Sequence, residues 1–226
     1  MTSETPGGWP AATLPAPAEP GEPFARSFYE RPAEQVALDL LGSFLLTHRS
    51  GAVSVAQIVE TEAYVGPHDD ASHAAERVGR TARNASMFGR PGTAYVYRIY
   101  GIHWCLNVVT GREGYPAAVL LRAACPVSGI EAMRERRGGR RDRDLLRGPG
   151  NLCSALGVDG SLDGHLLDRP PLEIRSGGVV DPARIRSGPR VGVTRAADLP
   201  LRFSVRDCAW VSGRSPSPPT TAMSDK

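Results

Sequence analysis

Three segments rich in β-branched and aromatic residues limit most strongly what this chain can fold into. They are residues 52–65 (AVSVAQIVETEAYV), 93–109 (TAYVYRIYGIHWCLNVV) and 117–121. Such side chains favour strands because they pack well on a pleated surface. Strand-like composition returns near residue 190 (RVGV) and over residues 201–211 (LRFSVRDCAWV). We therefore expect these segments to form strands of one sheet.

Helical periodicity occurs before and between the predicted strands. Within residues 32–46, Val36, Leu40 and Leu41 fall on one helical face, and Pro32 suits the first turn of a helix. Residues 129–137 (GIEAMRERR) and 151–156 (NLCSAL) also have helical spacing. Strands combined with flanking helices in this order predict a single compact domain of the α+β class.

The two ends of the chain differ in composition from its middle. Residues 1–23 and 214–226 are rich in proline and small residues and have almost no apolar periodicity, which predicts two disordered tails. Residues 24–213 contain no repeat or linker and predict one folded domain. No apolar run approaches the roughly 20 residues that span a bilayer, and the N-terminus lacks the features of a signal peptide. We therefore expect a protein without membrane contact, located in the cytosol or the nucleus.

The cysteines and basic residues exclude some chemistry. Cys105, Cys125, Cys153 and Cys208 lie far apart, which predicts reduced core thiols and argues against an iron–sulfur cluster. The formal net charge of +3 is too small by itself to indicate nucleic-acid binding. Of the 27 basic residues, however, all but Lys226 are arginine, which binds phosphate in a bidentate manner and so suits a polyanionic partner.

The predicted strand over residues 58–64 (IVETEAY) places ionisable groups on one surface. A period of two puts Glu60, Glu62 and Tyr64 on the same face. One interpretation is a solvated strand face. The other is a cleft, where burial and like charge raise the pKa of one carboxylate toward that of a general base.

A polar loop follows this strand. Residues 67–73 (PHDDASH) bring His68, Asp69, Asp70 and His73 close together in the sequence. Histidine and aspartate are ligands for divalent metals, so a metal-dependent phosphohydrolase is an alternative function for the chain. The other interpretation of this segment is an ordinary exposed loop.

Aromatic residues are concentrated within residues 95–104. In a straight strand Tyr97 and Tyr100 would point to opposite faces, so they serve one site only if the chain bends, and Gly101 permits that bend. The segment is either an aromatic core strand or a stacking pocket with a wedge residue of the kind that base extrusion requires. The most basic stretch, residues 134–147, is typical of a solvated helix end, although the GPGN that follows could let backbone amides approach a phosphate.

Taken together, these segments resemble the alkyladenine (3-methyladenine) DNA glycosylase family. Seven motifs carry the resemblance in order: FYERPAEQVALDLLG from 28, IVETEAYVGPHDDASHA from 58, RTARNASMFGRPGTAYVYRIYG from 80, LNVVT from 106, AVLLRA from 118, GPGNLCSALGV from 148 and LRFSVRDCAWVS from 201. They extend over nearly all of the predicted domain. The fold implied is a compact α+β domain with a curved antiparallel sheet and a protruding hairpin that inserts into DNA. The location implied is the nucleoid in the cytoplasm of a bacterium or the nucleus of a eukaryote.

The resemblance implies a role for each residue that matches a family motif. Glu62 corresponds to the general base that activates the attacking water, and Arg122 to an arginine near the backbone of the flipped nucleotide. Three residues match the pocket that stacks on or hydrogen-bonds the flipped base: Tyr64, His73 and Tyr97. Asn107 corresponds to the residue that crowds the 2-amino group of guanine, and Tyr100 to the wedge that fills the vacated position in the duplex.

The implied reaction needs no cofactor and no metal. The expected enzyme is a monomer that flips alkylated or deaminated purines, such as 3-methyladenine, hypoxanthine or ethenoadenine, from double-stranded DNA and hydrolyses the N-glycosidic bond. Because the only lysine lies in the predicted C-terminal tail, we expect no Schiff base and no strand cleavage. A third possible function is a non-catalytic nucleic-acid binding module.

Overall fold

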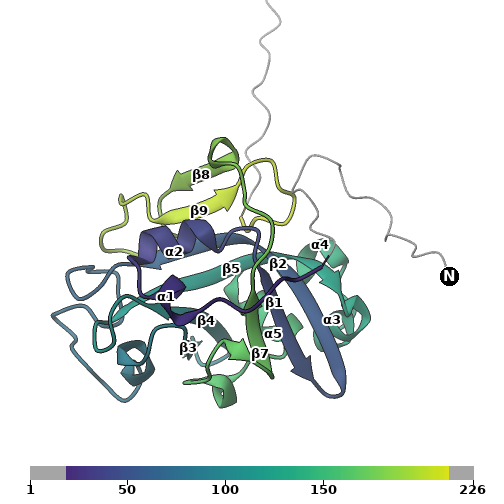
Figure 1. Ribbon diagram of the computed structural model, residues 1–226, viewed down its shortest axis with the longest axis horizontal. Coiled ribbons are helices and arrows are strands. Elements are labelled where there is room, and N and C mark those ends of the chain that lie inside the picture. The colour runs from purple at the N-terminus through teal and green to yellow at the C-terminus, as the bar shows by residue number, and fades with distance from the viewer. Residues whose placement is uncertain (1–18, 214–226) are drawn as a thin grey trace, which may run out of the picture.

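The computed structural model describes residues 19–213 (Figure 1). Most of the predicted N-terminal tail and all of the predicted C-terminal tail lie outside the described residues. Residues 19–23 are described, and they differ from the prediction of a disordered tail. The Gly21 amide donates to the Ser176 carbonyl at 2.9 Å, and Pro23 forms a bridge with Arg175. The chain therefore joins the sheet before residue 24.

Within residues 19–213, one antiparallel sheet of nine strands organises the fold. The order of the main path is β3-β4-β5-β2-β1-β7-β6, and β9 pairs with both β2 and β8. The strands are β1 (Phe44–Arg49), β2 (Ala52–Tyr64), β3 (Ala94–Ile99), β4 (His103–Thr110), β5 (Ala117–Ser128), β6 (Asp168–Arg169), β7 (Leu172–Arg175), β8 (Ile185–Gly188) and β9 (Arg202–Val205). The predicted α+β class with a curved antiparallel sheet is confirmed.

Short helices cover this sheet. They are α1 (Arg26–Tyr29), α2 (Ala33–Asp39), α3 (Ile130–Arg136), α4 (Asp142–Leu145) and α5 (Pro149–Leu156), with 3₁₀ turns at η1 (Ala85–Phe88), η2 (Gly160–Leu162) and η3 (Pro182–Arg184). Helix α2 packs on β2 and β5, where the Thr61 hydroxyl donates to the Ala37 carbonyl at 2.8 Å, and α5 packs on β4 and β5. No helix within residues 19–213 has the length and apolar run needed to cross a membrane.

The short helix predicted within residues 32–46 is observed as α2. Helix α2 ends at Asp39, and the apolar run that follows enters strand β1. Gly42 makes the change of direction with φ of +86°, and a Cβ at this position would lie 2.3 Å from the Gly178 carbonyl oxygen, so only glycine fits. A short apolar run is equally compatible with a buried helix or a buried strand, and here the pairing of β1 with β2 and β7 decides.

The prediction of a strand near residue 190 is wrong. Strand β8 ends at Gly188, and residues 190–193 form a loop. The Val191 amide donates to the side chain of Glu62 instead of to a neighbouring strand, and the side chain of the preceding Arg190 is buried in an ion pair with Asp69. Likewise, β9 takes only part of the predicted strand over residues 201–211, and the chain turns after Val205.

Two further features agree with the sequence analysis, namely the bend that Gly101 permits and the free, buried cysteines. Strands β3 and β4 form an antiparallel pair in which Ile99 faces His103, so the chain reverses through Tyr100, Gly101 and Ile102. Tyr100 and Gly101 adopt φ values of +52° and +71°, which supplies the bend expected at Gly101. All four cysteines are free and buried.

Candidate active site

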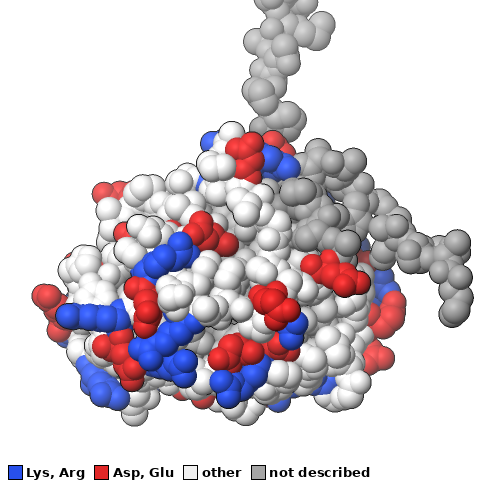
Figure 2. Space-filling view, viewed as in Figure 1, with Lys and Arg blue, Asp and Glu red and all other residues white. Residues whose placement is uncertain are grey.

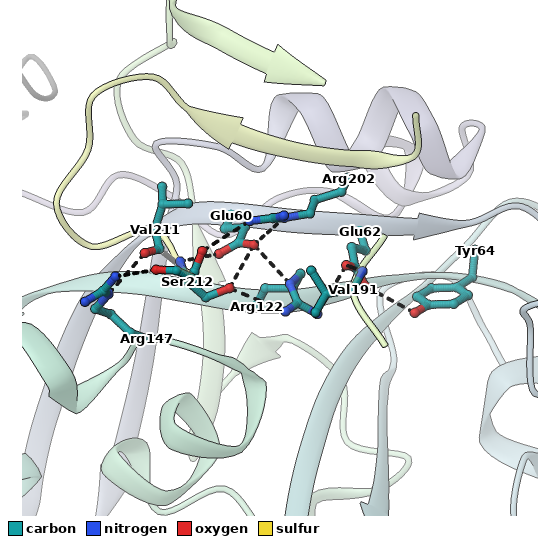
Figure 3. Close-up of polar contacts among 10 residues, drawn as sticks. Glu60, Glu62, Tyr64, Arg122, Arg147, Val191, Arg202, Val211 and Ser212 are labelled. Carbon is teal, nitrogen blue, oxygen red and sulfur yellow. Dashed lines mark hydrogen bonds and ion pairs between the residues drawn. The ribbon is translucent and has the colours of Figure 1, made fainter. Parts of the chain in front are cut away.

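The two glutamates of β2 form a buried ionic cluster around one arginine. Glu60 and Glu62 are both fully buried, so the interpretation of a solvated strand face is wrong. Arg122 of the neighbouring strand β5 reaches both carboxylates, with Nε 3.0 Å from Glu60 Oε1 and Nη1 3.2 Å from Glu62 Oε1 (Figure 3). The predicted common face of these residues is confirmed, because one guanidinium contacts both.

Glu62 is held from three sides. In addition to the contact with Arg122, its Oε1 accepts a hydrogen bond of 2.7 Å from the Val191 amide, and its Oε2 accepts one of 3.1 Å from the Tyr64 hydroxyl (Figure 3). Burial raises the pKa of Glu62 above its usual value, although Arg122, the Val191 amide and Tyr64 act in the opposite direction. The result is a fixed carboxylate with increased basicity.

Glu60 has a different environment from that of Glu62. Its carboxylate accepts from Arg202 Nε at 2.6 Å, from the Ser212 amide at 2.7 Å and from the Ser212 hydroxyl at 3.0 Å, besides its contact with Arg122. These partners occupy both carboxylate oxygens. Glu60 therefore serves to anchor Arg122, whose Nη1 points to Glu62, and its negative charge also raises the pKa of Glu62.

A pocket of about 390 Å³ lies beside this cluster. Six of the seven predicted site residues line it, namely Tyr64, His73, Tyr97, Tyr100, Asn107 and Arg122. The seventh, Glu62, is buried directly beneath the lining residues Tyr64 and Val191, to which it is hydrogen-bonded. The structure thus brings together residues from the strands β2, β3, β4 and β5 and from the loops after β2 and β8, and Glu62 and Val191 are 129 positions apart.

The aromatic groups of the pocket are neutral. The rings of His73 and Tyr97 meet edge to face with centroids 4.4 Å apart, and His73 Nδ1 forms a 3.0 Å hydrogen bond with the Tyr95 hydroxyl. Burial, with the nearby charge of Arg83, lowers the pKa of His73, and burial raises the pKa of Tyr97. Deeper in the pocket Asn107 Nδ2 donates to the Tyr95 carbonyl at 3.0 Å, which fixes the orientation of its amide.

The tip of the β3–β4 pair is exposed and apolar. Tyr100 is 83% exposed and Ile102 is 66% exposed, which is unusual for such large side chains. Tyr100 also lines the pocket, so the turn between these strands lies at its mouth.

The alternative metal site does not assemble. Both carboxylate oxygens of Asp69 are taken by Arg190, and His73 is bonded to Tyr95. Among residues 19–213 no group of three histidine, cysteine, aspartate or glutamate side chains is arranged to hold a metal ion. The grouping of His68, Asp69, Asp70 and His73 in the sequence is therefore not a grouping of ligands in space.

Sequence reasoning missed the loop that closes the site. Arg190 lies across the ring of Tyr64 with Cζ 4.7 Å from the ring centroid, and its guanidinium is held by Asp69 at 2.5 and 2.8 Å. The next residue, Val191, donates to Glu62. The local sequence here, RVGV at residues 190–193, on its own predicted a strand and gave no signal of this arrangement.

Comparison with known proteins identifies the family of the chain. The model of the methylpurine-DNA glycosylase family matches residues 27–209, almost all of the described chain. The chain belongs to this family. The predicted resemblance is confirmed, and as a member of the family the chain is a DNA glycosylase, a hydrolase of DNA repair.

Several relatives of the glycosylase are named for 3-methyladenine DNA glycosylase activity. One from Rhodopseudomonas palustris strain HaA2 is 49% identical over 88% of this chain and 95% of its own length. Another from Granulibacter bethesdensis is 50% identical over 82% of this chain and 85% of its own length. A relative from Methanoculleus marisnigri is 48% identical over 83% of this chain and 97% of its own length. The similarity to these relatives thus spans most of the chain.

Proposed function

We propose that this glycosylase flips 3-methyladenine and related alkylated or deaminated purines, including hypoxanthine and ethenoadenine, from double-stranded DNA and hydrolyses their N-glycosidic bonds. The observation that carries the proposal is the fixed, buried carboxylate of Glu62 beneath an aromatic pocket. The enzyme acts as a monomer and leaves an abasic site without cutting the strand.

Glu62 acts as the general base. A raised pKa brings a carboxylate closer to the range in which it accepts a proton from water efficiently, and the three hydrogen-bond donors keep its position fixed. Its negative charge also stabilises the positive charge that develops on the sugar as the bond to the base lengthens, as in glycoside hydrolysis. Arg122 positions Glu62 and lies where it can contact the phosphate backbone of the flipped nucleotide.

The pocket selects electron-poor purines. Its volume of about 390 Å³ lies within the range of small-ligand sites, and a base can enter it only after leaving the duplex stack. Tyr64, His73 and Tyr97 offer aromatic faces that attract a cationic alkylpurine by stacking and cation–π interactions, worth on the order of 1 kcal/mol or more for each contact. A neutral His73 matters here because an imidazolium would repel the cationic base.

Asn107 and Tyr100 complete the recognition of damaged DNA. The fixed amide of Asn107 lies in the pocket, where it crowds the 2-amino group of guanine and so disfavours the normal base. Tyr100 is the wedge that takes the place of the extruded nucleotide, because an exposed aromatic residue on a tight turn can enter the stack between neighbouring bases.

The proposal is tested by identifying the released product. Duplexes that contain one 3-methyladenine, hypoxanthine or ethenoadenine are incubated with the enzyme in EDTA, and the free base is measured by mass spectrometry. We expect the damaged base and an intact abasic strand, and no release from an undamaged duplex. Release of a phosphate, or loss of activity in EDTA, would contradict the proposal.

A further inference from the structure

A second hollow, separate from the base pocket, is lined by four arginines. It measures about 450 Å³ and lies between strands β8 and β9 and the segment that follows β9. The arginines come from distant parts of the chain: Arg143 of α4, Arg186 of β8, Arg202 of β9 and Arg206. Asp207 is the acidic residue in the lining. We refer to this hollow as the arginine cleft.

Most of the positive charge in the arginine cleft is available to a ligand. Among residues 19–213, the side chains of Arg143 and Arg186 form no hydrogen bond or ion pair, and both are exposed. Arg206 uses only Nε, which donates to the Ile185 carbonyl at 3.2 Å. Arg202 is the exception, because Glu60 neutralises it. The lining of the cleft therefore contains three guanidinium groups other than that of Arg202, and one carboxylate, that of Asp207.

Other parts of the surface differ from this arrangement. Arg134, Arg141 and Arg169 are each paired with a neighbouring carboxylate. On the face drawn in Figure 2, basic and acidic side chains are intermixed rather than gathered by sign. In the arginine cleft, by contrast, guanidinium groups without an ionic partner in the described chain line one hollow together, and such groups bind phosphate oxygens in a bidentate manner.

The arginine cleft and the base pocket are neighbours. Gly188 lines the cleft and Val191 lines the pocket, and three residues of chain span at most about 11 Å. Ser212 of the cleft also accepts a 3.4 Å hydrogen bond from Arg122 of the pocket (Figure 3). One strand of duplex DNA advances about 3.4 Å along the helix axis for each nucleotide, so this upper limit corresponds to roughly three nucleotides.

We propose that the arginine cleft binds the phosphodiester backbone of DNA about three nucleotides from the base that enters the pocket. This inference rests on the proposed function, since it places the cleft relative to a flipped nucleotide. The contact is independent of base sequence and fixes the position of the duplex on the enzyme.

The first test measures how binding depends on salt. The double variant Arg143→Gln, Arg186→Gln removes two positive charges from the arginine cleft. The control variant Arg141→Gln, Arg169→Gln makes the same change in charge outside the cleft, at exposed arginines that are paired with carboxylates. Affinity for an undamaged duplex is measured by fluorescence anisotropy from 50 to 200 mM salt. Each lost phosphate contact lowers the slope of log affinity against log salt by about 0.9.

In the cleft variant we expect the slope of log affinity against log salt to fall by about 1.8. Between 50 and 200 mM salt, wild type should then lose about twelvefold more affinity than the cleft variant. The control slope should stay close to that of wild type. Equal slopes in the cleft variant, the control and wild type, with unfolding midpoints unaltered, would overturn the proposal. Undamaged DNA is used here so that the result does not depend on base excision.

The second test locates the contact along the strand. A duplex with a tetrahydrofuran abasic analogue fixes the register, and single phosphates are replaced in turn by uncharged methylphosphonates. Replacement about three nucleotides from the analogue should weaken binding of wild type and have no effect on the cleft variant. If every replacement weakens both proteins equally, the cleft is not a backbone site, whether or not the enzyme excises bases.

Discussion

Replacing Asp69 by asparagine should destabilise the protein strongly. Asp69 and Arg190 form a bidentate ion pair in which both side chains are fully buried. The substitution keeps the shape of the side chain but leaves the Arg190 charge without a counter-ion. Removing one partner of a buried pair costs about 3–5 kcal/mol. For a chain of this size, each kcal/mol lowers the unfolding temperature by roughly 2–4 °C, so the expected decrease is about 6–20 °C.

The next residue in the chain provides a matched control. The side chain of Asp70 is 60% exposed and lies 3.8 Å from Arg77, and exposed pairs of this kind contribute at most about 1 kcal/mol. Urea unfolding of wild type, Asp69→Asn and Asp70→Asn gives the two differences in free energy. If the Asp69→Asn difference is no larger than that of Asp70→Asn, the buried pair is not the structural element described above.

The same pair predicts how stability depends on pH. Burial raises the pKa of Asp69, but the hydrogen bonds and charge of Arg190 outweigh it, so the net pKa is lower than usual. A carboxyl with a lowered pKa in the folded state stabilises the protein above its unfolded pKa of about 3.9, and this contribution is lost as the pH falls through the folded value. The difference between wild type and Asp69→Asn should therefore be constant near neutral pH and decrease only below about pH 4.

Three further predictions concern activity. Because the pKa of Glu62 is raised, the rate of single-turnover excision should begin to fall on acidification at a higher pH than an ordinary glutamate would give. Arg122 lowers the pKa of Glu62, so Arg122→Gln should move this fall in rate to a still higher pH. A pH dependence that Arg122→Gln leaves unchanged would contradict the role of Glu62 as the general base. Tyr100→Ala should slow excision from duplex DNA more than from single strands, and an equal effect on both would exclude a wedge. Borohydride should trap no covalent adduct with damaged DNA, because Lys226 is the only lysine, and a trapped adduct would show lyase chemistry.

The sequence was sufficient for contacts that follow from local periodicity. The alternation of β2 placed Glu60, Glu62 and Tyr64 on one face, and Gly101 marked the turn between β3 and β4. Family motifs then named residues of β4 and β5 that the fold brings to the same pocket. Composition alone could not distinguish the end of α2 from the start of β1, because an apolar run suits both and only pairing between strands selects one.

The loop after β8 could not be predicted from the sequence, for a different reason. Arg190 and Asp69 are 121 positions apart, and Val191 and Glu62 are 129 positions apart. Neither contact follows from a period or a turn preference, because each depends on how β9 returns beside β2. A buried arginine in a segment that otherwise has the composition of a strand is visible only once its partner has been placed.

The role of Glu62 is tested most directly by single-turnover excision of hypoxanthine from a duplex oligonucleotide in EDTA, with alkali to reveal abasic sites. Wild type is compared with Glu62→Gln, which keeps the size of the side chain and an oxygen for the Val191 amide. Loss of a general base should slow excision by about 10²–10⁴-fold. DNA binding and the unfolding midpoint should stay close to those of wild type, because Arg122, unlike Arg190 in Asp69→Asn, keeps a second buried counter-ion in Glu60. A folded, DNA-binding Glu62→Gln enzyme that excises hypoxanthine at the wild-type rate would contradict the proposed mechanism.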